Sequence, residues 1–167
     1  MKKPFPHLFS VLMGLALFSS ISLAEAPARP LPRFQFKTLT GKAVRTQDLK
    51  GKVTVIDFWA VWCKPCIAEV PEYNVFYREY KSKGVMLLGM AADSGTEVEL
   101  KDAVRRFKIE YPVISLSTTE MDLFNDVAVF PTTWVIDSNG MIAKEILGSP
   151  AEKIKTIRAF VDSLLKK

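Results

Sequence analysis

Four short apolar runs rich in β-branched and aromatic residues limit what this chain can fold into. The runs are VTVIDFWA at 53–60, VMLLGMAA at 85–92, TTWVID at 132–137 and MIAKEIL at 141–147. A helical pattern from Cys66 to about Lys81 separates the first two, and a second helical pattern at 96–109 precedes the third. The last two runs flank Ser138-Asn139-Gly140, which is typical of a hairpin turn. This order predicts an α/β fold with a mixed central sheet flanked by helices.

The ends of the chain add a hairpin and a helix to this expected domain. Residues 34–52 predict an N-terminal β-hairpin around Thr40-Gly41. A closing amphipathic helix is expected to have Ser149 as its N-cap and Pro150 as its first residue, with Glu152 completing a capping box. The apolar face of the helix at 96–109 is expected to comprise Val98, Ala103, Val104 and Phe107.

The first 26 residues have the pattern of a secretory signal peptide. Lys2 and Lys3 precede an apolar stretch, and Ala24 and Ala26 stand in the spacing of a cleavage site. The alternative is an uncleaved inner-membrane anchor through residues 8–24, which fall just short of a bilayer span. We expect residues 27–33 to form a Pro-rich tether and residues 34–167 to form one domain, located in the periplasm or otherwise outside the cytoplasm.

Charge and histidine content restrict the chemistry. The 167-residue chain has a net charge of +5, but its Lys and Arg residues are spread among acidic ones, so no nucleic-acid partner is expected. The single histidine, His7, lies in the leader. A mature chain without histidine lacks the commonest proton shuttle and the commonest metal ligand at neutral pH. We therefore expect no metal site and no cofactor.

The two cysteines of the chain, Cys63 and Cys66, follow the first apolar run directly. A structural disulfide would close too short a loop to stabilise the fold much. A zinc site needs about four ligands, and haem attachment needs a histidine where Ile67 stands. The pair is therefore interpreted as redox-active. Cys63 is expected at the N-cap of the next helix, where Lys64 and the helix dipole favour a thiolate and Pro65 fits the first turn.

Two carboxylates are expected near the pair. We assign Cys63 as the nucleophile and Cys66 as the resolving thiol. Asp57 interrupts an apolar strand, so its pKa should be raised and it is favoured as the proton acceptor for Cys66. Glu69 follows Cys66 by three residues, and it either influences that thiol or is a solvated first-turn acid.

Together, WAVWCKPC and FPTTWVID resemble the thioredoxin superfamily, and the pattern over about residues 31–165 looks like secreted TlpA/ResA-type thiol-disulfide oxidoreductases. The resemblance implies a thioredoxin fold with an inserted helix after GVMLLGMAAD. It also implies a cis-proline at Pro131 opposite the cysteines, preceded by the substrate-binding Phe130. The expected substrate surface comprises Trp62, Lys64, Pro65, Phe130 and Pro131. Among such proteins many carry Asn at position 57, whereas thioredoxin itself has Asp.

The function expected from these features is a protein-disulfide reductase acting on exported proteins, with a role in cytochrome c maturation implied by the resemblance. Two carboxylates near the pair and the absence of histidine predict a moderately stabilised thiolate, hence a potential nearer to about −270 mV than to about −120 mV. A membrane electron-donor protein and a monomeric state are expected. The alternative is a copper metallochaperone using the two cysteines as soft ligands.

Overall fold

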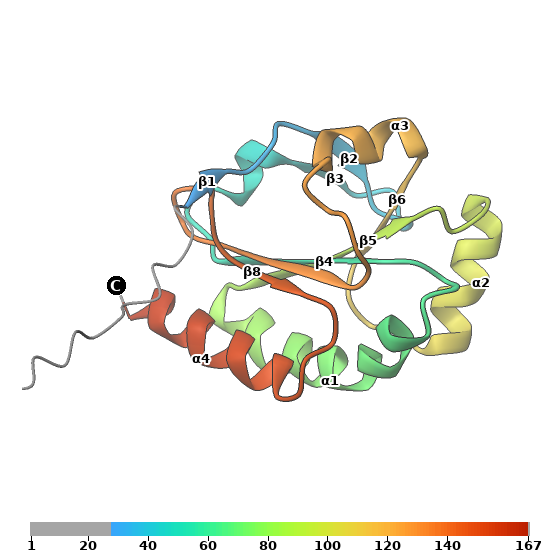
Figure 1. Cartoon of the computed structure of the whole chain (residues 1–167). Helices are drawn as coiled ribbons and strands as arrows, with labels where there is room; N and C mark the ends of the chain where they lie inside the picture. Colours follow the sequence, from blue (N-terminus) through green and yellow to red (C-terminus); the bar gives the residue numbers. More distant parts are fainter. Residues whose placement is uncertain (1–27, 167) are drawn as a thin grey trace, which may run out of the picture.

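The computed structural model describes residues 28–166, whose central feature is a six-stranded mixed sheet (Figure 1). Its strands are β1 (Arg29–Pro30), β4 (Thr54–Trp59), β5 (Met86–Ala92), β6 (Val113–Leu116), β7 (Thr132–Ile136) and β8 (Met141–Leu147). Their spatial order is β1-β8-β7-β4-β5-β6. Strands β4, β5 and β6 are parallel, while β7 is antiparallel to β4, β8 to β7, and β1 to β8. The expected mixed sheet is confirmed.

Helices and a hairpin cover the two faces of this sheet. The helices are α1 (Lys64–Tyr80), α2 (Glu97–Phe107), α3 (Thr118–Met121) and α4 (Lys153–Leu165), with short 3-10 turns η1 (Thr46–Leu49), η2 (Lys81–Lys83) and η3 (Asp122–Phe124). The hairpin consists of β2 (Gln35–Lys37) and β3 (Ala43–Arg45). Helices α1 and α4 lie on one face, and the hairpin and α3 lie on the other (Figure 1). The expected N-terminal hairpin and inserted helix are both present.

Strand β4 lies at the centre of the sheet, and all six of its residues are buried. Because side chains alternate along a strand, Val55 and Trp59 join the core beneath α1 and α4, while Ile56 and Phe58 join the core beneath the hairpin. By the same alternation, Asp57 lies on the α1 and α4 side. A carboxyl group is thereby placed within an apolar layer.

The buried face of α2 differs from the expected one. Val98 is 70% exposed, so its predicted burial is wrong, whereas Leu100 is fully buried together with Ala103. Val104 and Phe107 pack against the core at its margin, as expected. The helix begins after Thr96, whose hydroxyl caps it and whose partner Glu99 completes a capping box. This cap sets the helix rotation that turns Val98 outward.

Helix α4 begins three residues later than the sequence pattern predicted. The expected capping box of Ser149 and Glu152 is wrong, because residues before Lys153 form a turn in which the Lys153 N–H donates to the Pro150 carbonyl. Glu152 adopts the left-handed conformation (φ 64°) and makes no side-chain cap. Such a conformation costs a non-glycine residue about 1–2 kcal/mol. It redirects the chain so that Lys153 becomes the first helical residue and is buried.

Part of the expected tether belongs to the folded domain. Arg29 and Pro30 pair with Ile142 and Met141 of β8, and Leu31 is buried in the core beneath the hairpin. The edge of β8 offers unpaired backbone groups and the apolar Leu31 completes the core, so the domain starts before residue 34. Strand β6, which periodicity alone did not predict, is a further addition. Residues 1–26, the predicted leader, lie outside the described part, and within residues 28–166 no helix is long and apolar enough to span a bilayer.

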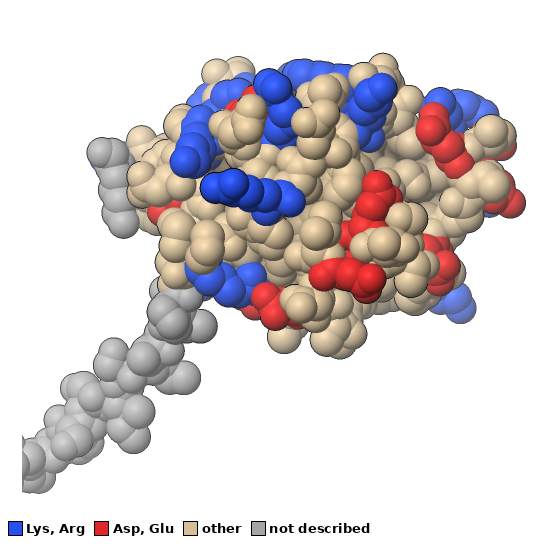
Figure 2. Space-filling view, turned by 90° about the horizontal axis from the view of Figure 1, so that it is seen from above, with Lys and Arg blue, Asp and Glu red and all other residues tan. Residues whose placement is uncertain are grey.

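Charged side chains of both signs cover the face seen from the hairpin side. Figure 2 shows Lys and Arg gathering toward the β1 end of this face and Asp and Glu gathering toward the end with α2. On the hairpin, Lys37 of β2 and Arg45 of β3 are exposed. Arg45 forms an ion pair with Asp48 of η1.

Candidate active site

Cys63 and Cys66 form a disulfide (S–S 1.99 Å) where β4 passes into α1. Cys63 is the N-cap of α1, and its sulfur accepts a hydrogen bond from the Cys66 N–H at 3.3 Å. Pro65 occupies the first turn, where its missing N–H costs nothing. The predicted N-cap position of Cys63 is confirmed. The unpaired amides of this helix end favour negative charge on that sulfur after reduction.

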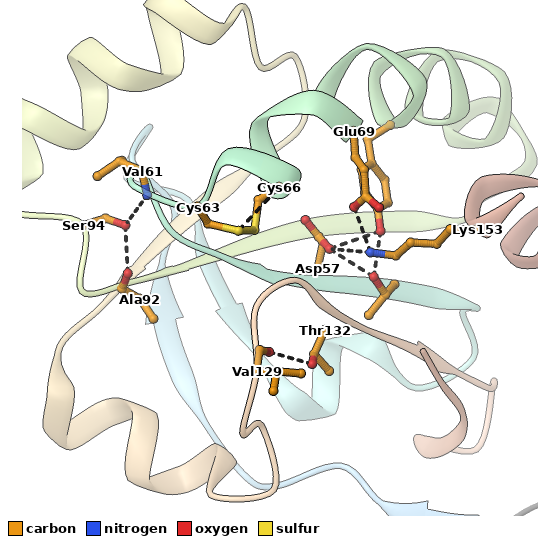
Figure 3. Close-up of a disulfide and its surroundings, with 12 residues drawn as sticks. Asp57, Val61, Cys63, Cys66, Glu69, Ala92, Ser94, Val129, Thr132 and Lys153 are labelled. Carbon is orange, nitrogen blue, oxygen red and sulfur yellow. Dashed lines mark hydrogen bonds and ion pairs between the residues drawn. A yellow bond between two sulfur atoms is a disulfide. The ribbon is translucent and has the colours of Figure 1, made fainter. Parts of the chain in front are cut away.

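Hydrogen bonds from a neighbouring loop hold the segment before Cys63. The Ser94 hydroxyl accepts from the Val61 N–H at 3.1 Å and donates to the Ala92 carbonyl at 2.8 Å (Figure 3). The Trp62 indole N–H donates to the Asp93 carbonyl at 3.0 Å. The redox loop is thus tied to the loop that follows β5. Sequence reasoning missed Ser94, although a serine two residues after a buried strand was a visible signal.

An aromatic pair, exposed at Trp62 and partly buried at Phe130, lies beside the disulfide. Trp62 is 58% exposed, and its ring meets that of Phe130 edge-on, with centroids 5.9 Å apart. The Phe130–Pro131 peptide bond is cis, as the resemblance implied, and Pro131 is buried. Lys64 and Pro65 are exposed on the other side of Cys63. Of the five residues expected to form a substrate surface, four are exposed or partly exposed, and Pro131 is buried.

Asp57 is buried, and Figure 3 shows its carboxyl close to the disulfide. Its carboxyl oxygen Oδ1 lies 3.1 Å from the Tyr73 hydroxyl and 3.0 Å from the Thr133 hydroxyl, and these hydroxyls are 2.7 Å apart. Burial raises the pKa of Asp57 from 3.8 to about 6, against the lowering effect of the nearby Lys153 ammonium. The predicted upward shift is confirmed. A carboxyl group with a pKa near neutrality suits proton transfer.

Glu69 is paired with a buried lysine rather than solvated. Its side chain is 12% exposed, and Oε2 accepts from Lys153 Nζ at 2.8 Å. Its interpretation as a solvated first-turn acid is wrong, because Glu69 lies in the second turn of α1 and faces α4. Lys153 Nζ also lies 3.9 Å from Asp57 Oδ1. Figure 3 shows the Asp57 carboxyl between the disulfide and Lys153, with Glu69 above them.

Lys153, Tyr73 and Thr133 were not found by sequence reasoning. Lys153 is four residues before Ile157 and eight before Val161, so it occupies the apolar face of α4. A lysine on the apolar face of a predicted helix could have indicated a buried ion pair. Tyr73 and Thr133 lie in ordinary helix and strand patterns, so nothing in the sequence indicated their role. Among residues 28–166, no group of three or more His, Cys, Asp or Glu side chains could hold a metal ion.

Comparisons with known proteins agree with this geometry. Residues 27–145 match the AhpC/TSA family. The thiol-disulfide oxidoreductase ResA of a Bacillus cereus strain is 35% identical over 122 residues, covering 73% of this chain and 70% of ResA. The thioredoxin-like protein YneN of Bacillus subtilis (strain 168) is 29% identical over 144 residues, covering 84% of each.

Solved structures show the same fold. A thioredoxin-family thiol:disulfide interchange protein from Chlorobium tepidum TLS is 28% identical with a TM-score of 0.72, covering 85% of this chain and 99% of that one. A putative DsbE from Chlorobium tepidum gives a TM-score of 0.76 at 24% identity over the same shares. The chain therefore belongs to the AhpC/TSA family, and within its thioredoxin fold it carries the Cys-x-x-Cys pair of a thiol-disulfide oxidoreductase.

Proposed function

We propose that this protein is an extracytoplasmic reductant of protein disulfides. One observation carries the proposal: the Cys63–Cys66 disulfide lies at the start of α1, where Cys63 is the N-cap, and Figure 3 shows the buried carboxyl of Asp57 beside it. The helix end favours a thiolate at Cys63, and Asp57 supplies a proton acceptor near neutrality. The exposed Trp62 ring and the partly buried Phe130 ring that it meets offer an apolar contact for a polypeptide substrate.

The exchange proceeds in two attacks. The Cys63 thiolate of the reduced protein attacks a substrate disulfide, so a mixed disulfide forms and one substrate sulfur leaves as a thiolate. Cys66 then gives its proton to the Asp57 carboxylate, directly or through one water molecule. The Cys66 thiolate attacks Cys63 Sγ, forms the intramolecular disulfide and releases the second substrate thiolate. Two electrons pass from the cysteine pair to the substrate.

The charges beneath the pair favour a reductant. Asp57 and Glu69 bring two negative charges and Lys153 brings one positive charge, so the group retains one negative charge when all three are ionised. Net negative charge opposes the thiolate form. A strong oxidant instead needs a greatly stabilised thiolate. We therefore place the potential nearer to about −270 mV than to about −120 mV.

The leader and the direction of electron flow suggest the location and the partners. A signal peptide at 1–26 would export the protein to the periplasm or an equivalent compartment, where the reduced pair must be regenerated. We propose a membrane protein as electron donor, with the protein acting as a monomer. Exported proteins with disulfides are the substrates, and apocytochrome c is one such substrate to examine.

Trapping in cells tests this function. With Cys66→Ser, the mixed disulfide at Cys63 should persist and yield adducts that a reductant dissolves. The matched control carries both Cys63→Ser and Cys66→Ser and should yield none. Absence of adducts in the single variant would contradict the proposal. A glutathione titration tests the direction, and a midpoint above about −180 mV would overturn the assignment as a reductase.

A further inference from the structure

A lysine buried at the start of α4 faces the redox site. Lys153 is 4% exposed, and its ammonium contacts Glu69 at 2.8 Å and Asp57 at 3.9 Å. Its Nζ also lies 5.7 Å from the centroid of the Tyr73 ring. Burying a cation is costly unless anions pair with it. Lys153 is therefore tied to the two carboxylates that serve the cysteine pair.

The helix that carries Lys153 gains nothing from a cation at this position. Lys153 is the first residue of α4, where the positive end of the helix dipole disfavours an ammonium group. The preceding Glu152 adopts a left-handed conformation, and its own side chain pairs with the exposed Lys155. The apolar packing of α4 comes from the buried Ile154, Ile157 and Val161, with Phe160 and Leu164 at the margin. The position of Lys153 is explained by its partners on α1 and β4.

Groups from three elements surround the Asp57 carboxyl. Lys153 reaches it from α4, Glu69 and Tyr73 from α1, and Thr133 from β7. The Tyr111 ring, which precedes β6, lies 6.1 Å from the Tyr73 ring. Lys153 brings positive charge and Glu69 brings negative charge, so these two neighbours act on Asp57 in opposite directions.

We propose that Lys153 is a positioning residue that keeps the Asp57 carboxylate ionised and aimed at the cysteine pair, while Glu69 balances the strength of that attraction. This inference rests on the proposed function, in which Asp57 receives the proton of Cys66. With Lys153 in place, Asp57 enters the resolving step as a carboxylate. Glu69 holds the ammonium at the closer distance, so Asp57 keeps enough basicity to take the proton. The proton passes from Cys66 to the Asp57 carboxylate.

Two substitutions should shift the pKa of Asp57 in opposite directions. Lys153→Met removes the attraction, so the pKa of Asp57 should rise by about one pH unit or more. Glu69→Gln removes the opposing charge, so the pKa of Asp57 should fall. The double variant should give a value between those of the single variants, because both effects are absent. Lys153→Arg should stay near the wild type because it keeps the charge.

The test titrates Asp57 by carboxyl-carbon NMR in each oxidised variant and measures the pH profile of insulin reduction by each reduced variant. Lys155→Met is the matched control, a lysine on the same helix that is exposed and that, within residues 28–166, pairs with the exposed Glu152. It should leave both readouts at the wild-type values. Opposite displacements in the Lys153→Met and Glu69→Gln variants support the proposal. If Lys153 had only a structural role, Lys153→Met would lower the stability of the protein and the rate of insulin reduction. It would not change the midpoint of the Asp57 titration or that of the pH profile.

Two results would overturn the inference. One is an Asp57 titration and a pH profile unchanged by Lys153→Met, and the other is a displacement in the same direction for both single variants. If Lys153→Met does not fold, the Glu69→Gln variant alone tests the inference, because the pKa of Asp57 must fall in that variant. The proposed function fails separately: a wild type that cannot reduce insulin would refute the reductase, while the NMR titration would still decide the role of Lys153.

Discussion

Replacing Asp57 by asparagine should stabilise the oxidised protein at neutral pH. The pKa of Asp57 is raised from 3.8 to about 6 in the folded state, mainly by burial. Below pH 3.8 the group is protonated both folded and unfolded, so it costs nothing. As the pH rises toward 6 the unfolded chain loses this proton while the folded one retains it, and stability falls. At 1.36 kcal/mol for each pH unit, the full cost above about pH 6 is about 3 kcal/mol.

Asparagine avoids this cost and keeps the shape of the side chain. Its amide can still bond with the hydroxyls of Tyr73 and Thr133, which lie about 3 Å from Asp57 Oδ1. Lys153 loses a carboxylate at 3.9 Å but retains Glu69 at 2.8 Å. We therefore expect a gain of about 2–3 kcal/mol at pH 7.5.

Urea unfolding of the disulfide-bonded wild type and Asp57→Asn, at pH 4 and pH 7.5, measures this gain. The difference in the free energy of unfolding should be small at pH 4 and large at pH 7.5. The reduced variant should meanwhile exchange more slowly with protein disulfides, because a proton acceptor contributes about 10²–10⁴-fold. Equal stability of the two proteins at pH 7.5, or a difference independent of pH, would refute the reasoning about burial.

Three further outcomes are expected. In the reduced protein, iodoacetamide at pH 7 should modify Cys63 before Cys66, because Cys63 caps α1; peptide mapping that found the reverse order would exchange their roles. Phe130→Ala should slow reduction of insulin about 2–10-fold more than reduction of a small disulfide, because the ring contact with a polypeptide is lost; the exposed Val98→Ala is the control, and equal losses would argue against a substrate contact. Gly89→Ala should lower the free energy of unfolding by about 1–3 kcal/mol, measured in urea, because a Cβ there would meet the Tyr111 ring at 2.9 Å; unchanged stability would show that the ring can move aside.

Local rules predicted much of the site because its reactive part is local. The N-cap at Cys63 and the proline in the first turn follow from residues within one helical turn. The raised pKa of Asp57 follows from a lone carboxyl in an apolar strand. Even the cis bond before Pro131 was accessible, through a resemblance over most of the chain. The first two features depend on short spacings or on the apolar pattern of one strand.

The electrostatic partner of the site could not be predicted in the same way. Lys153 and Glu69 are 84 residues apart, and their contact depends on how α4 packs against α1. The expected capping box at Ser149 also placed the start of α4 too early. Local sequence propensity does not predict the left-handed conformation of Glu152, after which the buried Lys153 begins the helix. The pairing of Arg29 and Pro30 with β8 was missed for a similar reason. Proline-rich sequence suggests a tether unless the edge strand that receives it is known.

The pairing of β1 with β8 also places the start of the folded domain at the end of the sheet opposite the cysteines. Pro30 lies beside Met141, next to the turn after β7, and the register of β7 on β4 puts this turn beside Thr54. Cys63 follows the opposite end of β4, about 20 Å away along the strand. Figure 1 shows β1 and the start of α1 at opposite ends of the sheet. A surface that held this domain through the residues before β1 would therefore leave the cysteines facing outward, toward partners arriving from the far side.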